Sequence, residues 1–142
     1  MLRDTARAVI VKDGRVLLME RWRKDPKTGK QLHYFSIPGG GIEKGETPGA
    51  AVVREVYEEM SIFVRPRELL AKTERHAGGH HYFYICDYLS GEPRLNPAGP
   101  EAKMQDRETH KPRWVSALEL NGVINLHPDY RVIQKEIETR LN

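Results

Sequence analysis

The stretch from Gly40 to Ile62, which reads GGIEKGETPGAAVVREVYEEMSI, restricts the possible folds more than any other part of the sequence. It joins a glycine-rich turn to a short segment with helical character. Thr47 is a suitable N-cap for a helix, and Pro48 suits the first helical position, where its missing N–H is no loss. Because the following residues keep a helical period, the pattern predicts a helix that ends at Met60.

This predicted helix has two different sides at about 100° per residue. One side is apolar and carries Val52, Val53, Val56 and Met60. The other is acidic and carries Glu55, Glu58 and Glu59. Carboxylates three or four positions apart on a helix repel by about 0.2–0.5 kcal/mol per pair, so the acidic side requires a cation. Hard oxygen ligands of this kind suit Mg²⁺ or Mn²⁺.

Arg54 offers a second way to neutralise this charge. It lies four residues before Glu58, at a spacing that brings side chains together on a helix, and it is placed to meet Glu46 in the preceding loop. For the segment EVYEE alone, a solvated acidic surface is a complete explanation. A metal site needs support from a longer pattern.

The spacing of the whole stretch supplies that support. Gly40 is followed after five residues by Glu46 and after seven more by Arg54, and the chain continues as EVYEEMSI. This gapped pattern resembles the signature of the Nudix hydrolase family at nearly every fixed position. The departure is Ser61, where the family usually has a glycine that ends the helix in a left-handed conformation. We expect Ser61 to cost about 1 kcal/mol or to shift the helix end slightly.

The resemblance implies an α/β fold, a Nudix-type α/β/α sandwich with a mixed, curved sheet. The helix of the signature would cover one face of the sheet and a terminal helix the other. It also implies that Glu55, Glu58 and Glu59 hold one or more Mg²⁺ ions, for which Mn²⁺ can substitute. A backbone carbonyl of Gly40, or of its neighbour Gly39, would join them.

Further site residues follow from the resemblance outside the signature. A basic side chain after the first hairpin contacts phosphate in nucleotide-cleaving members, and Arg21 and Arg23 stand there. Members of the family often recognise the nucleobase of the substrate near the start of the terminal helix, where Asp129 and Tyr130 lie. The alternative for the two arginines is a solubilising role in a loop. For Asp129 and Tyr130 it is capping and packing.

The resemblance leaves the general base open between Glu55, Glu59 and Glu108. Several Nudix triphosphatases use a glutamate six residues before a tryptophan as a further metal ligand or base, and Glu108 precedes Trp114 by six residues. Arg54 is counted with this catalytic group. The segment 90–109 around Glu108 is the longest irregular stretch, and loops of this length are often functional.

The implied function is Mg²⁺-dependent hydrolysis of the diphosphate linkage of a nucleoside diphosphate derivative. The short chain, the PGGGIEKGETP register and Glu108 favour a natural or modified nucleoside triphosphate, cleaved to monophosphate and pyrophosphate. Alternatives within the enzyme class are ADP-ribose, nucleotide sugars and dinucleoside polyphosphates. A different class, a non-catalytic nucleotide-binding regulatory module, often loses carboxylates of the signature, and this sequence keeps them all.

Composition agrees with one compact domain over residues 1–142. With 39% apolar residues the chain can bury one good core. A net charge of +3 from 23 basic and 20 acidic residues describes a mixed surface, which favours a small nucleotide over a nucleic-acid polymer. We find no membrane span or signal peptide, and the lone Cys86 indicates a reducing cytoplasm. Both a monomer and a homodimer are compatible with the sequence.

The remaining pattern outlines the scaffold. Asp13-Gly14 is a hairpin turn signal between two β-branched or apolar runs. Strands are expected at 5–11, 15–22, 32–37, 62–64, 69–76, 82–89 and 111–116. His76, His80 and His81 surround a Gly-Gly pair, which we interpret as a hairpin turn rather than a metal site. A terminal helix is expected after His127, with an apolar stripe of Val132, Ile133, Ile137 and Leu141.

Overall fold

The computed structural model describes residues 3–94 and 108–141. Its elements in chain order are β1 (Thr5–Lys12), β2 (Arg15–Lys24), β3 (Gln31–Ser36), β4 (Gly39–Gly41), α1 (Pro48–Met60), β5 (Phe63–Glu74), β6 (His80–Ser90), β7 (Glu108–Ser116), α3 (Ala117–Leu120), α4 (Pro128–Arg131) and α5 (Gln134–Leu141). Among the described residues, none of the helices is long and apolar enough to cross a membrane.

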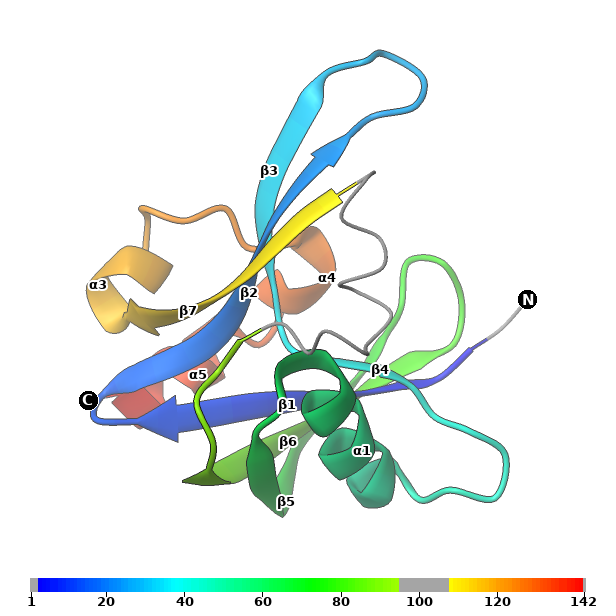
Figure 1. Ribbon diagram of the computed structural model, residues 1–142, viewed down its shortest axis with the longest axis vertical. Helices are drawn as coiled ribbons and strands as arrows, with labels where there is room; N and C mark the ends of the chain where they lie inside the picture. Colours follow the sequence, from blue (N-terminus) through cyan, green and yellow to red (C-terminus); the bar gives the residue numbers. More distant parts are fainter. Residues whose placement is uncertain (1–2, 95–107, 142) are drawn as a thin grey trace.

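The strands form one mixed sheet in the order β3-β2-β1-β6-β5, with β4 paired to β1 and β7 paired to β2. The pairing of β1 with β6 is parallel, and the other pairings are antiparallel. The sheet stays open and does not curl into a barrel. Figure 1 shows α1 on the near side of β1 and β6, with α5 behind β1 and β2. The expected α/β fold with a mixed sheet is confirmed.

The first hairpin, between β1 and β2, is paired only next to its turn. Asp13 and Gly14 have positive φ values of 51° and 72°, as a tight two-residue hairpin turn requires. Beyond the turn, β1 pairs with β2 only through two residue pairs, Val11 with Val16 and Lys12 with Arg15. Past this point β1 pairs with β4, while β2 pairs with β3 and β7. This divergence brings the glycines of β4 next to α1.

Each face of the sheet has its own apolar core, because side chains alternate along a strand. In β2, Leu17 and Met19 face α1, whereas Val16 and Leu18 face the terminal helices. The core under α1 contains Ala6, Ala8, Ile10, Leu17, Met19, Ala51, Val52, Val56, Met60, Ile62, Val64 and Cys86. The opposite core contains Val9, Val16, Leu18, Phe35, Ile37, Phe83, Val115, Leu120, Leu126, Tyr130, Ile133, Ile137 and Leu141.

Some expected elements of the sheet differ in the structure. The glycine-rich segment 39–41 is not only a turn, because it pairs with β1 as the short strand β4. The expected strands at 62–64 and 69–76 are one strand, β5, with register shifts between Pro66 and Leu69 and between Leu69 and Ala71. These irregularities let the chain pass Pro66 without ending the strand.

The terminal helix is also broken, into α4 and α5. At the junction the Ile133 N–H donates to the carbonyl of Tyr130, a tighter turn than the α-helical one. Val132, expected in the apolar stripe, is 62% exposed, whereas Ile133 and Ile137 are buried. The buried residues recur every four positions on one face, and Val132 lies about 100° away from that face. Tyr130 and Ile133 both belong to the core on this side of the sheet.

Ser61 ends α1 without shifting it. Its φ and ψ are 60° and 30°, the left-handed conformation, and its N–H donates to the carbonyl of Tyr57. We expect Ser61→Gly to raise the free energy of unfolding by about 0.5–1 kcal/mol, because glycine adopts this conformation without steric cost. Chemical denaturation measures this difference. Ser90→Gly, at the end of β6, is the control and should bring no gain; an unchanged or lower stability of Ser61→Gly would contradict the expectation.

Candidate active site

The N-terminal half of α1 forms as the sequence predicts. The Thr47 hydroxyl accepts the N–H of Ala50 at 3.1 Å, and Pro48 occupies the first turn. Val52, Val56 and Met60 are fully buried, while Val53 is only partly buried. The helix is therefore held by its apolar side, and its charged side is presented at β4 and the adjoining loop.

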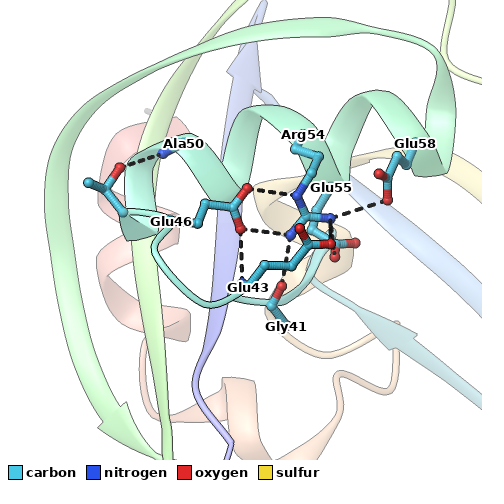
Figure 2. Close-up of polar contacts among 8 residues, drawn as sticks. Gly41, Glu43, Glu46, Ala50, Arg54, Glu55 and Glu58 are labelled. Carbon is cyan, nitrogen blue, oxygen red and sulfur yellow. Dashed lines mark hydrogen bonds and ion pairs between the residues drawn. The ribbon is translucent and has the colours of Figure 1, made fainter.

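Arg54 is the central cation of this charged side (Figure 2). Its guanidinium donates two hydrogen bonds to the Glu46 carboxylate, from Nε to Oε2 at 2.7 Å and from Nη2 to Oε1 at 2.9 Å. Nη2 also donates to the carbonyl of Gly41 at 2.9 Å, and Nη1 reaches Glu55 at 3.0 Å and Glu58 at 3.3 Å. Arg54 therefore neutralises part of the acidic side and ties the helix to the preceding loop.

These contacts change the acidity of the groups involved. Hydrogen bonds from Arg54, and then from the Glu43 N–H, lower the pKa of Glu46 to about 2. The hydrogen bonds that Arg54 donates to Glu46 in turn raise the pKa of Arg54. The pair therefore stays fully charged at neutral pH.

We expect Glu46 to make the free energy of unfolding decrease as the pH falls from the ordinary pKa of this group, 4.5, to its folded pKa of about 2. A depressed folded pKa means that the unfolded chain binds the proton first, so the stabilisation is complete above about 4.5 and is lost as pH falls toward about 2. Denaturant unfolding across this range measures the slope. Glu46→Gln should flatten it, and Glu74→Gln, an exposed control, should not; equal slopes for both variants would contradict this role.

Glu55 lies directly against the backbone of Gly40. A Cβ atom built on Gly40 would clash with the carboxylate of Glu55. Gly40 pairs with Ala6 of β1. A larger residue at position 40 would therefore displace the Glu55 carboxylate from its place beside β4.

Glu59 differs from the other glutamates of the helix. The sequence placed it on a shared acidic surface, but it is only 2% exposed and lies between α1 and the sheet. The reason is its position three residues after Val56, at the border of the buried side. Arg21 of β2 approaches it, with 3.5 Å between Nη2 and Oε2.

The surroundings of Arg21 contain two residues that sequence reasoning missed. Its Nε donates to Ser36 Oγ at 2.7 Å, and its Nη1 lies 3.0 Å from His110 Nε2. His110 was within reach of a sequence argument, because it stands two residues after Glu108, at the period of a strand. No sequence signal identified Ser36, since its role depends on the pairing of β2 with β3.

Arg23 and Glu108 lie opposite each other in the backbone register of β2 and β7. Arg23 is exposed, so it is available to a ligand. The side chain of Glu108 lies outside the described residues, and its proposed role as base or metal ligand stays a prediction.

Asp129 and Tyr130 have partners within the protein. Asp129 Oδ2 accepts hydrogen bonds from His81 Nε2 at 2.9 Å and from the His76 N–H at 3.2 Å. Burial raises the pKa of Asp129, but these hydrogen bonds outweigh it and the net pKa is lowered. Tyr130 is buried, and Arg7 lies over its ring at 5.4 Å. Their contacts fasten α4 to the sheet, which agrees with the packing alternative, and a role toward substrate remains a prediction.

His81 completes this fastening. Burial lowers the pKa of His81, which favours the neutral ring. Asp129 accepts from Nε2, and Nδ1 then accepts from the Thr5 hydroxyl at 2.6 Å. The His76 to His81 segment forms the expected turn between β5 and β6. Across residues 3–94 and 108–141, no group of three or more His, Cys, Asp or Glu side chains is arranged to hold a metal ion.

A divalent cation would nevertheless find the right donors at α1. Glu55, Glu58 and Glu59 supply hard carboxylate oxygens, and Glu55 rests on the backbone of Gly40. Arg54 already bonds Glu55 and Glu58, so these two carboxylates are held in one region but are occupied by a protein cation. The donor chemistry fits a hard cation such as Mg²⁺, which Glu55 and Glu58 would bind by giving up contacts to Arg54.

Comparison with known proteins identifies the family and the fold. The model of the NUDIX domain matches residues 1–137. The chain therefore belongs to the Nudix family, and the resemblance seen in the sequence is confirmed. A MutT structure from work on Aliivibrio salmonicida and Vibrio cholerae has the same fold, with a TM-score of 0.71 at 16% identity over 96% of each chain.

Two relatives with assigned activities are similar in sequence. The ADP-ribose pyrophosphatase of Methanocaldococcus jannaschii is 34% identical over 69% of this chain, and the match spans only 58% of that relative. The 8-oxo-dGTP diphosphatase of Escherichia coli is 29% identical over 80% of each chain. Both relatives are hydrolases by name, which supports the expected enzyme class.

Proposed function

We propose that this protein is a Mg²⁺-dependent hydrolase, for which Mn²⁺ can substitute, that cleaves the diphosphate linkage of a nucleoside diphosphate derivative. The observation that carries the proposal is the complete carboxylate set of α1 next to Gly40. Nudix hydrolases generally need a divalent metal ion, and the donors present here suit one. Arg21 lies at the same place, and it adds a positive charge where substrate phosphates would bind.

The residues at α1 and β4 would have two roles, metal binding and the positioning of the metal ligands. Glu55, Glu58, Glu59 and the carbonyl of Gly40 would hold the ion. Once bound, a divalent ion supplies charge neutralisation and a water of lowered pKa. Arg54 keeps the helix and its loop in register through Glu46, so the carboxylates stay at the same place on the fold.

Substrate would be bound by charged groups around this centre. Arg21 and Arg23 come from one strand, and both offer guanidinium donors suited to phosphate oxygens. Asp129 and Tyr130 would contribute at the start of α4, on the base side. The proton of the attacking water would pass to Glu55, Glu59 or Glu108.

A nucleoside triphosphate is the substrate class we favour. Water adds to one phosphorus of the chain, the bridging oxygen leaves, and the products are a nucleoside monophosphate and pyrophosphate. Support comes from relatives named for triphosphates, the 8-oxo-dGTP diphosphatase and a CTP pyrophosphohydrolase of Escherichia coli that is 29% identical over 60% of this chain. ADP-ribose is the second candidate, because the Methanocaldococcus relative carries that name at higher identity.

A substrate panel tests the proposal. Nucleoside triphosphates, oxidised triphosphates, ADP-ribose, nucleotide sugars and diadenosine polyphosphates are incubated with Mg²⁺, with Mn²⁺ or with a chelator, and the products are identified. Metal-dependent release of pyrophosphate and monophosphate from a triphosphate is the expected result. A preference for ADP-ribose would move the assignment to the second candidate. Nucleotide binding without turnover of any compound would identify a binding module instead of an enzyme.

A further inference from the structure

Side chains from three different elements contact the guanidinium of Arg21. Ser36 of β3, His110 of β7 and Glu59 of α1 each contact one nitrogen of its guanidinium, at 2.7, 3.0 and 3.5 Å. β2 lies between β3 and β7 in the sheet, so Arg21 is approached from both neighbouring strands. These contacts, made by different nitrogens, restrict the rotation of the guanidinium group.

The distances show which contacts set that orientation. The contacts to Ser36 and His110 are within the usual range of hydrogen bonds, whereas the contact to Glu59 at 3.5 Å is at its limit. By distance, the contacts to Ser36 and His110 are stronger than the contact to Glu59, and they orient the guanidinium on the two sides that they meet.

The surroundings of His110 suit it to orient the Arg21 guanidinium. It is 4% exposed, and Ser36 is equally buried, so water does not compete for the Arg21 N–H groups on these sides. Arginine has only donors, so His110 Nε2 must accept from Nη1 through its lone pair, with the ring proton on Nδ1. The backbone register pairs Arg21 directly with His110, which sets the distance between the two side chains.

We propose that His110 is a positioning residue that orients Arg21 toward Glu59 and toward the phosphates of the substrate. The inference rests on the proposed function for its kinetic consequence, but the contact itself does not. A structural role in the sheet is the competing explanation, and it predicts a loss of stability without any dependence on Arg21.

A double-mutant cycle separates the two explanations. His110→Ala, His110→Gln, Arg21→Ala and the double variant His110→Ala with Arg21→Ala are compared with the wild type. We expect His110→Ala to lower kcat/KM by about 10- to 100-fold, because displacement of a binding group by about 1 Å has effects of this size. In the Arg21→Ala background the same change should have no further effect. His110→Gln should recover most of the loss, since its amide oxygen can accept from Arg21.

The control and a second readout keep the test independent of turnover. Lys111→Ala, an exposed neighbour on β7, should leave kcat/KM unchanged. His110 contacts Nη1, so the readout is the Arg21 Nη–H signal in ¹H–¹⁵N NMR spectra of the metal-free protein. This signal should be protected from exchange in the wild type and His110→Gln, and lost in His110→Ala. An equal kinetic effect with and without Arg21, or an unchanged Nη–H signal in His110→Ala, would overturn the proposal. If the wild type cleaves no nucleotide, the proposed function fails, and the NMR comparison still decides the role of His110.

Discussion

Glu59→Gln is expected to lower turnover by about 10²- to 10⁴-fold, the range found when a group that acts on the reacting centre is removed. The amide keeps the size of the side chain but loses its charge, so it binds a divalent ion poorly and no longer balances Arg21. Because Glu59 is only 2% exposed, the variant should also lose about 1–2 kcal/mol of stability.

Glu58→Gln provides the matched comparison. Turnover should fall by a similar order of magnitude, but the Glu58 side chain is 44% exposed, so stability should change by less than about 0.5 kcal/mol. Glu68→Gln, on the exposed part of β5, should change neither quantity. Steady-state kinetics with the best substrate and thermal unfolding measure both effects. Near-normal rates for Glu58→Gln and Glu59→Gln would show that the assignment of these glutamates is wrong.

Arg54→Ala is expected to be the most destabilising change at the surface of α1. The variant loses two hydrogen bonds to Glu46 and one to the carbonyl of Gly41, and it leaves the carboxylates of Glu55 and Glu58 without their protein cation. Together these losses should cost about 2–3 kcal/mol and lower Tm by roughly 6–12 °C. Differential scanning calorimetry in the presence of a chelator measures the shift.

A divalent ion should restore part of this stability. In Arg54→Ala the carboxylates of Glu55 and Glu58 no longer bond the guanidinium that competes with Mg²⁺ or Mn²⁺, and a ligand that binds only the folded state raises its stability. Tm should therefore rise more with added Mn²⁺ in Arg54→Ala than in the wild type. Arg54→Lys should not recover the wild-type Tm measured in the presence of a chelator, because an ammonium group cannot form the bidentate contact with Glu46. Arg65→Ala, whose exposed side chain pairs with Asp87, is the control with little effect. A Tm of Arg54→Ala that equals the wild type would contradict the central role of Arg54.

The structure revises one consequence drawn from the sequence. A helical wheel places Glu55, Glu58 and Glu59 on one acidic side, opposite the apolar one, so all three were expected outside the core. The wheel does not show how far the sheet extends over the helix. Because β2 and β7 bring Arg21 and His110 close to α1, Glu59 is covered, while Glu58 at the next position stays partly exposed.

The candidate site was therefore predicted in part. Arg54 meets Glu46 and Glu58 as its spacing indicated, since these contacts lie within the helix and the loop that leads into it. Ser36 and His110 were not found, because their relevance depends on strands that are distant in sequence. The proposed substrate roles of Arg23, Glu108, Asp129 and Tyr130 remain predictions.

The sequence by itself determined α1, its caps, the first hairpin turn and the family, because each of these depends on residues that are close together in the chain. Only the tertiary structure decided the pairing of β4 with β1, the break between α4 and α5, the burial of Glu59 and the environment of Arg21. These features depend on strand order and register across the sheet. Packing between segments far apart in the chain sets that order, and no local pattern records it.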